Sequence, residues 1–288
     1  MIVITGATGQ LGRLVITDLL GRGVPAAQIG AAVRTPAKAA DLAALGVQVR
    51  EADYNQPATL TRAFAGAERV LLISSSEVGQ RLPQHRAVIE AAQGAGVAQL
   101  VYTSLLHADR SPLALGDEHR ATEALIRASG LTHVLLRNGW YTENHLASVP
   151  PALQHGAFFG SAGNGRIASA ARADYAAAAA AVLAQPIGAN RVIELAGDSA
   201  YTLAELVVEL NRQTGQAVVY NDLPAAAFEA ALKGAGLPDG LAALLANSDA
   251  GAAQGGLFDD SRQLSTLIGR PTTPLAVSMA AALAVPLK

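Results

Sequence analysis

Short apolar runs alternate with longer stretches of helical period over the first half of the chain. Residues 2–4 form the first run, and apolar residues then recur every three or four positions over 11–19. The same alternation predicts strands over 28–33, 47–49, 69–73, 100–103 and 131–137, with helices over 36–45, 57–65, 82–95 and 117–129 between them. Strands separated by helices at this spacing indicate a parallel sheet covered on both faces. The predicted fold class is therefore α/β, with a Rossmann-type doubly wound parallel sheet.

The alternation loosens after Arg137. Residues 138 to about 170 are expected to form loops with one short helix. The later elements are an Ala-rich helix over about 172–185, a strand over 191–195, a helix over 202–213, a short strand over 217–220 and mainly helical structure from 223 onward. Thr202 and Glu205 have the spacing of a capping box. We predict a Rossmann domain over 1–137 and, over 138–288, a smaller, mainly helical C-terminal lobe that packs on the sheet and partly completes it.

The composition excludes several classes of protein. The chain has 288 residues, of which 51% are hydrophobic and 15% charged, which is ample for a large core. A net charge of −2 without a basic block gives no reason to expect nucleic acid as a partner. The chain has no cysteine, so disulfides and thiol chemistry are excluded, and its six histidines have no metal-ligand spacing, so no metal is expected.

The chain is expected to be cytoplasmic and to have no membrane contact. A strand is predicted from residue 2, which leaves no room for a signal peptide. The Ala-rich run over 173–184 is too short and too rich in small residues to span a membrane.

Three glycines follow the first predicted strand at intervals of three residues. A strand, a glycine turn and a helix leave backbone N–H groups at the helix start, where a pyrophosphate can bind. Gly6 would allow the tight turn, Gly9 the approach of the phosphates, and Gly12 the close packing of helix on strand. The predicted cradle comprises Gly6, Ala7, Thr8, Gly9, Gln10, Leu11 and Gly12. The alternative is a glycine turn that binds nothing.

The end of the second predicted strand indicates which nucleotide binds. An acidic residue there would accept from the ribose 2′-hydroxyl of NADH, but this chain has Arg34. A guanidinium favours the 2′-phosphate of NADPH, although a solvated surface arginine is the alternative. Asp53, at the end of the third predicted strand, could bind the adenine or simply form a turn. Ser74, Ser75 and Ser76, after the fourth predicted strand, could line the path to the nicotinamide ribose or form a plain loop. Arg172, before the Ala-rich helix, could reach the cofactor or order its own turn.

The usual catalytic pair of a short-chain reductase is missing. Ser104 ends the fifth predicted strand, where such enzymes carry a serine, and we include it among the cofactor-binding candidates. No Tyr-x-x-x-Lys follows, because no tyrosine lies between Tyr102 and Tyr141 and the chain has only three lysines. Reduction of a quinone needs no strong proton donor, since the charge of the product is delocalised. His119 is a weak candidate donor, since the helix dipole adequately explains the acidic pair beside it, and no catalytic residue is assigned.

The substrate is expected to bind after the sixth predicted strand. This segment combines the only tryptophan with a tyrosine, a glycine and hydrogen-bonding side chains. A flat aromatic acceptor could stack there and have its oxygens oriented. The candidates are Asn138, Gly139, Trp140, Tyr141, Thr142 and Glu143. The alternative is a tryptophan that anchors the loop to the core.

Several runs together resemble a known family. They are residues 6–12, Arg34, 72–81, 102–109, 136–141 and the Gly-Gly-Leu-Phe-Asp-Asp run over 255–260. They resemble the NADPH:quinone oxidoreductases of the NmrA-like type, a group of atypical short-chain dehydrogenase/reductases, from residue 1 to about 275. The resemblance implies NADPH at 6–11, Arg34 and 74–76, and a quinone near 138–143.

Other functions stay open at this point. Related proteins reduce azo or triarylmethane dyes, and others sense the nucleotide without catalysis. The expected small-molecule partner is a quinone, with a homodimer left open beside a monomer.

Overall fold

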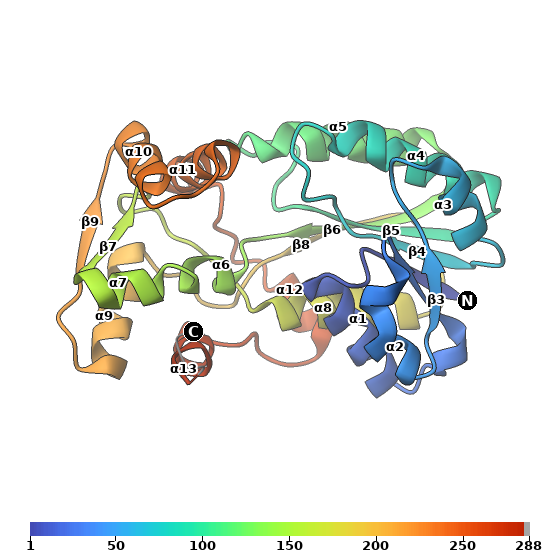
Figure 1. The fold of residues 1–288 in the computed structure, drawn as a ribbon, viewed down its shortest axis with the longest axis horizontal. Coiled ribbons are helices and arrows are strands. Elements are labelled where there is room, and N and C mark those ends of the chain that lie inside the picture. Colours follow the sequence, from blue (N-terminus) through green and yellow to red (C-terminus); the bar gives the residue numbers. More distant parts are fainter. Residues whose placement is uncertain (285–288) are drawn as a thin grey trace. The chain divides into compact units, whose positions relative to one another are not determined.

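Seven strands form the central sheet in the order β3-β2-β1-β4-β5-β6-β8 (Figure 1). This computed structural model describes residues 1–284. The strands are β1 (Ile2–Thr5), β2 (Ile29–Val33), β3 (Gln48–Glu51), β4 (Arg69–Leu72), β5 (Gln99–Leu105), β6 (Thr132–Asn138) and β8 (Arg191–Leu195). The pairs from β3 through β6 are parallel. The predicted doubly wound α/β fold is therefore confirmed, and the order reverses between β1 and β4.

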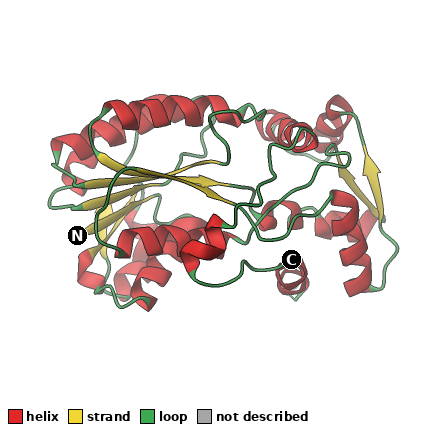
Figure 2. Cartoon of the chain, turned by 180° about the vertical axis from the view of Figure 1, so that it is seen from behind, coloured by secondary structure: helices red, strands yellow, loops and turns green. Residues whose placement is uncertain are grey.

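Helices cover both faces of this sheet, as Figures 1 and 2 show. One face carries α1 (Gln10–Gly21), α2 (Ala40–Ala44) and α8 (Arg172–Ala184), and the other α3 (Pro57–Ala63), α4 (Arg81–Gly94) and α5 (Leu115–Ala128). Every residue of β2 and β5 is buried, which fits the wholly apolar sequence of β2 and the apolar run over 100–102 in β5. The alanines of α8 are buried from Ala176 to Ala181, and α8 packs on α1.

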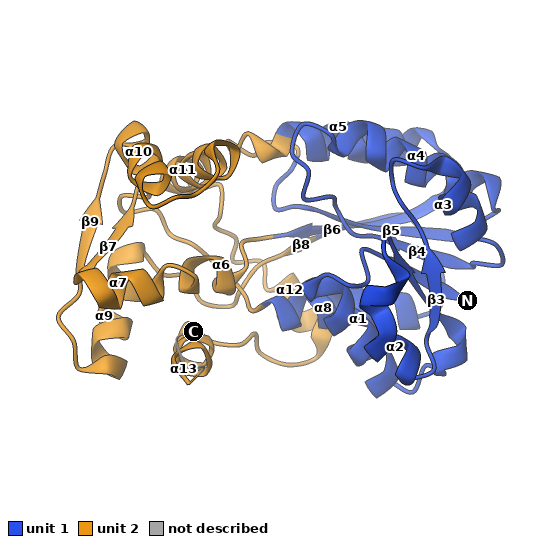
Figure 3. Ribbon diagram, in the orientation of Figure 1, with its two compact units in different colours: residues 1–108, 117–138, 172–193 blue, residues 109–116, 139–171, 194–288 orange. Residues whose placement is uncertain are grey.

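The chain forms two compact units (Figure 3). Unit 1 comprises residues 1–108, 117–138 and 172–193, and unit 2 comprises residues 109–116, 139–171 and the chain from 194 onward. The units are therefore assembled from interleaved segments. The division into a domain over 1–137 and a lobe over 138–288 stays a prediction.

Unit 2 contains a second, two-stranded parallel sheet of β7 (Ala157–Gly160) and β9 (Val219–Asp222). Its helices are α6 (Thr142–Leu146), α7 (Val149–His155), α9 (Leu203–Thr214), α10 (Ala225–Gly234), α11 (Asp239–Ala253), α12 (Gln263–Ile268) and α13 (Leu275–Leu283). The expectation of loops and one short helix over 138–170 is wrong, because this segment holds α6, α7 and β7. The strand expected over 217–220 begins later, at Val219.

Two local predictions about helix starts have different outcomes. The capping box of α9 is confirmed: Thr202 accepts from the Glu205 amide, and Glu205 accepts from the Thr202 amide. The helix expected over 36–45 instead begins with a 3₁₀ turn, η2 (Pro36–Ala39), and Thr35 makes no side-chain cap. A further 3₁₀ turn, η1 (Ala26–Gln28), precedes β2. Among residues 1–284, no helix has both the length and the apolar character needed to cross a bilayer.

Candidate nucleotide and substrate site

The glycine turn lies at the carboxyl end of β1, beside the point where the strand order reverses. Gly6 has a φ of 58°, and its carbonyl accepts from the Gly9 amide at 2.9 Å. A Cβ at Gly9 would lie 3.1 Å from that carbonyl oxygen, and a Cβ at Gly12 would lie 2.6 Å from it. The chain is therefore too close here for side chains. The first amides of α1 have no preceding helical carbonyl to donate to, which makes this turn suited to a pyrophosphate.

A hydroxyl pair, made by the buried Thr5 and the half-buried Tyr54, joins the ends of β1 and β4. The Thr5 hydroxyl donates to the Leu71 carbonyl at 3.0 Å and accepts from the Ile73 amide at 3.0 Å. The Tyr54 hydroxyl donates to Thr5 Oγ1 at 2.5 Å and lies 2.9 Å from the Ile73 carbonyl. Burial raises the pKa of Tyr54, so its hydroxyl keeps its proton. Sequence reasoning missed Tyr54, since nothing local distinguishes it from a surface tyrosine.

Arg34 directly follows β2 and has an exposed side chain. Asp53 lies after β3, where its carboxylate accepts from the Asn55 amide at 2.9 Å and from Gln56 Nε2 at 3.2 Å. These bonds fit the turn-forming alternative for Asp53. Its contact with adenine stays a prediction.

The serine run follows β4 and is fastened to the core. The Ser74 amide donates to Thr103 Oγ1 and the Ser75 amide to His85 Nε2, both at 2.9 Å. Because His85 Nε2 accepts from the backbone, its proton belongs on Nδ1, which lies 3.0 Å from Thr122 Oγ1. Burial lowers the pKa of His85 to about 3 and keeps the ring neutral. Ser76 lies in the same loop, where its carbonyl accepts from the Val78 amide at 3.1 Å.

Ser104 lies at the end of β5 in a buried ionic network. Its hydroxyl donates to Glu123 Oε1 at 2.6 Å, and Arg137 donates to both oxygens of Glu123 at 2.9 Å. Burial alone would raise the pKa of Glu123, but hydrogen bonds from Arg137 and Ser104 outweigh it and lower the pKa. The Ser104 hydroxyl is thus already engaged within the protein, and its contact with a cofactor stays a prediction.

His119 lies inside unit 1. The ring is 5% exposed, and its Nδ1 is 2.7 Å from the Tyr102 hydroxyl. Burial lowers the pKa of His119 to about 3. A proton donor to a bound acceptor needs an accessible ring that is protonated near neutral pH. His119 meets neither condition, so the structure makes it a structural partner of Tyr102.

Arg172 begins α8 and reaches the glycine turn. Its Nη1 donates to Oε1 of Gln10, the first residue of α1. The fold thereby brings together two predicted cofactor residues that are far apart in the sequence.

Asn138 ends β6 in unit 1. Its carbonyl accepts from the Leu106 amide at 2.9 Å. The side chain is 6% exposed, and its Oδ1 is buried without a hydrogen-bond partner among residues 1–284. A buried oxygen of this kind is open to a donor from a ligand or a water.

The segment that follows Asn138 belongs to unit 2 and is fixed by its backbone. The Gly139 amide donates to the Leu195 carbonyl at 2.7 Å. Tyr141 forms an isolated bridge with Ala170, whose carbonyl accepts from the Thr142 amide at 2.9 Å. Trp140 is buried, which fits its alternative role as an anchor. Glu143 lies in the first turn of α6.

A chain of buried hydroxyls continues from this segment, and we call Thr142, Ser169, Tyr201 and His145 the hydroxyl–imidazole chain. Thr142 Oγ1 lies 2.8 Å from Ser169 Oγ, which lies 2.7 Å from the Tyr201 hydroxyl. That hydroxyl is 3.0 Å from His145 Nδ1. Burial lowers the pKa of His145 to about 4, so the chain is neutral near pH 7. Sequence reasoning missed three of its members, because Ser169 and Tyr201 reach Thr142 and His145 only through the tertiary fold.

The late Gly-Gly-Leu-Phe run also has a structural role in unit 2. A Cβ at Gly256 would lie 2.6 Å from Leu113 Cδ1 and 2.7 Å from Pro112 Cγ. The Leu257 carbonyl accepts from the Ala168 amide at 2.9 Å, next to Ser169. The run therefore needs its glycine for close packing and supports the extended segment that carries Ser169.

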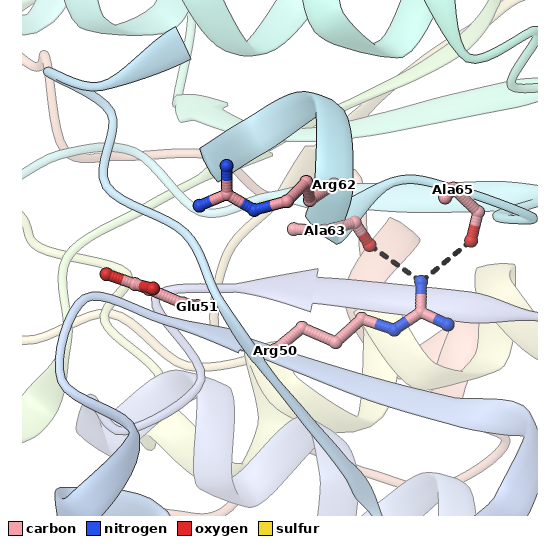
Figure 4. Close-up of a pocket in the computed structure, with 5 residues that line it drawn as sticks. All are labelled: Arg50, Glu51, Arg62, Ala63 and Ala65. Atoms are coloured by element: carbon pink, nitrogen blue, oxygen red, sulfur yellow. Dashed lines mark hydrogen bonds between the residues drawn. The ribbon is translucent and has the colours of Figure 1, made fainter. Parts of the chain in front are cut away.

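A cavity of about 320 Å³ lies at β3 and the end of α3 (Figure 4). It is lined by Arg50, Glu51, Arg62, Ala63 and Ala65, none of which is a predicted site residue. Arg50 donates to the carbonyls of Ala63 and Ala65 at 2.7 and 2.9 Å, so it caps the end of α3. No cluster of three or more His, Asp or Glu residues suited to a metal occurs among residues 1–284.

A glycine turn at the switch point of a doubly wound sheet defines a Rossmann-type nucleotide-binding protein. Residues 6–186 match the model of the family described as NAD(P)H-binding, and the chain belongs to this family. It is 62% identical to quinone oxidoreductase 2 of Escherichia coli K12 over 279 residues, which covers 97% of each chain. The recognised resemblance is thereby confirmed.

Solved structures agree with this assignment. An NADPH-dependent quinone oxidoreductase of Escherichia coli, complexed with NADPH, matches with a TM-score of 0.96 and 61% identity over 98% of this chain and 100% of that one. The triphenylmethane reductase of Citrobacter sp., complexed with NADP(H), matches with a TM-score of 0.93 and 37% identity over 98% and 100% of the two chains.

Proposed function

We propose that the protein is a flavin-free oxidoreductase that transfers hydride from NADPH to a quinone, as an atypical short-chain reductase that lacks the Tyr-x-x-x-Lys pair. The observation that carries the proposal is the likeness, over nearly the whole chain, to an NADPH-dependent quinone oxidoreductase. The geometry of the glycine turn supports it, since Cβ atoms at Gly9 and Gly12 would lie 3.1 and 2.6 Å from the Gly6 carbonyl oxygen, so this tight turn at the start of α1 needs its glycines.

The residues of unit 1 have defined tasks in this proposal. Amides over 6–11 bind the pyrophosphate, and Arg34 binds the 2′-phosphate. Arg172 orders Gln10 at the edge of the cradle. NADPH supplies the hydride when bound. The chain supplies orientation and exclusion of water, and a quinone needs little more because its reduced form delocalises the charge.

Steady-state oxidation of NADPH with a panel of benzoquinones tests the function. We expect turnover by purified protein that contains no flavin. Absence of turnover above the protein-free rate with every quinone would refute the proposal.

Replacement of Arg34 tests the nucleotide assignment. Arg34→Ser should weaken NADPH binding about 10- to 100-fold, because charge-assisted hydrogen bonds to the 2′-phosphate are lost. NADH binding should change by about twofold or less. The measurement is isothermal titration with each nucleotide, and Arg62→Ser is the matched control on α3. Equal losses for both nucleotides would remove Arg34 from the 2′-phosphate site.

A second acceptor class, the triphenylmethane dyes, is included in the test because the chain is also similar, at 37% identity, to a triphenylmethane reductase. If dyes of that class are reduced with higher kcat/KM than any quinone, the substrate assignment changes while the cofactor assignment stands. A protein that binds NADPH but reduces neither class fits the nucleotide-sensing alternative. We infer a cytoplasmic location, and sedimentation velocity decides between monomer and homodimer.

A further inference from the structure

The carboxylate of Glu77 lies against the guanidinium of Arg34. Arg34 Nη1 donates to Glu77 Oε1 at 3.1 Å. The two side chains are 68% and 45% exposed, so both solvent and a ligand can reach the pair. Exposed ion pairs contribute little to stability. The guanidinium can therefore exchange one anionic partner for another at small cost.

The Arg34–Glu77 pair spans the end of β1. Strands β2 and β4 lie on either side of β1 in the sheet. Arg34 directly follows β2, and Glu77 lies in the loop after β4, while the glycine turn starts where β1 ends. Nucleotides bind beyond the carboxyl ends of such strands. The pair thus lies in the region where the adenosine half of NADPH is expected.

Glu77 is held in place by residues other than Arg34. Its Oε2 accepts from Gln84 Nε2 at 2.8 Å, and Gln84 is 3% exposed. Its amide donates to Ser75 Oγ at 3.1 Å, and the Ser75 amide donates to the buried His85. The carboxylate therefore keeps a hydrogen bond and its position when Arg34 turns to another anion. It is a fixed negative charge beside the nucleotide site.

We propose that Glu77 is a specificity-determining residue that competes with the 2′-phosphate of NADPH for Arg34. This inference rests on the proposed function, because it takes Arg34 as the ligand of that phosphate. A bound 2′-phosphate brings negative charge beside a fixed carboxylate and removes its cationic partner. The 2′-hydroxyl of NADH carries no charge and meets neither penalty. Glu77 thereby limits the preference for NADPH over NADH.

Isothermal titration of the full-length protein with NADPH and NADH tests the competition. Glu77→Gln keeps the length of the side chain and an acceptor for Gln84 but removes the charge. It should tighten NADPH binding about 3- to 10-fold and change NADH binding by about twofold or less. Glu90→Gln, which removes the same charge from an exposed position on α4, is the matched control and should change neither affinity.

The double variant Arg34→Ser/Glu77→Gln tests whether Glu77 acts through Arg34. In an Arg34→Ser background, Glu77→Gln should retain about half of its effect or less. Unchanged or weaker NADPH binding by Glu77→Gln, or an equal gain for NADH, overturns the proposal. If Arg34→Ser weakens NADPH binding while Glu77→Gln has no effect, only the role of Glu77 is lost. If Arg34→Ser has no effect, the assignment of the 2′-phosphate to Arg34 fails as well.

Discussion

The glycine turn of unit 1 and the segment over 139–143 of unit 2 are built in opposite ways. The turn is made by residues within one short stretch. Cβ atoms at Gly9 and Gly12 would lie 3.1 and 2.6 Å from the Gly6 carbonyl oxygen. The segment over 139–143 is fixed by distant partners, among them Leu195, Ala170 and Ser169. A phosphate cradle can thus be encoded locally, whereas the proposed quinone-binding segment depends on the packing of unit 2.

The two regions also differ in how they use charge. Around the turn, Arg34 and Glu77 form an exposed ion pair, in which Arg34 can exchange Glu77 for an anionic ligand. The hydroxyl–imidazole chain of unit 2 is buried and neutral, since burial lowers the pKa of His145 to about 4. The first region is suited to recognise a charged nucleotide. The second is suited to hold a backbone segment in one conformation.

The largest expected effect is that of a side chain at Gly12. Gly12→Ala places a Cβ 2.6 Å from the Gly6 carbonyl oxygen and 2.7 Å from Ala7 Cα, so the turn must move. We expect a loss of about 2–4 kcal/mol in the free energy of unfolding, which is in the range of severe overpacking, and NADPH binding at least about 100-fold weaker. Urea denaturation and isothermal titration measure the two effects.

Gly21→Ala is the matched control for this change. It lies in the same helix, α1, with no atom within 4 Å of the added Cβ. Alanine there should be neutral or stabilise by up to about 1 kcal/mol. Wild-type NADPH affinity in Gly12→Ala would show that the close approach is not needed for the cradle.

A smaller effect is expected from the hydroxyl of Tyr201. Tyr201→Phe removes the link between Ser169 and His145, and should lower the free energy of unfolding by about 1–2 kcal/mol. The KM for a quinone should rise while the dissociation constant of NADPH stays unchanged, because the segment over 139–143 loses support. Tyr220→Phe, whose hydroxyl donates to Asp222 elsewhere in unit 2, is the matched control. A parallel change in NADPH affinity would contradict the separation of the two regions.

The smallest expected effect is a pH dependence from His145. Its folded pKa, about 4, lies below the ordinary value of 6.5. The unfolded chain therefore binds more protons between these values, and stability falls as pH decreases below about 6.5. The loss between pH 7 and pH 5.5 should be about 1 kcal/mol from this residue.

Burial also lowers the pKa values of His85 and His119 in unit 1, so these two residues also make the stability fall as pH decreases. Only a variant therefore isolates the contribution of His145. Urea denaturation across this pH range should show a shallower dependence in His145→Gln than in the wild type. His155→Gln, at an exposed position on α7, should keep the wild-type slope. Identical slopes in all three proteins would exclude a contribution from His145.

The sheet of unit 1 could be predicted because its strands are apolar runs between helices of clear period. Strand β7 could not, because its pairing with β9, which follows far along the chain, is formed only in the folded protein and leaves no local signal in either sequence. In the site, the glycine turn carries its geometry in its own spacing. Tyr54 and Tyr201 act through hydrogen bonds formed only in the folded chain, so no spacing marks them.

A single-turnover reaction tests the central claim most directly. Purified flavin-free protein is mixed with NADPH, deuterated at the transferable position, and one equivalent of a benzoquinone, and the nicotinamide absorbance is followed. The proposed function predicts stoichiometric formation of NADP⁺ and hydroquinone, slower with the deuterated than with the ordinary nucleotide when hydride transfer limits the rate. Oxidation no faster than in the protein-free mixture would contradict it.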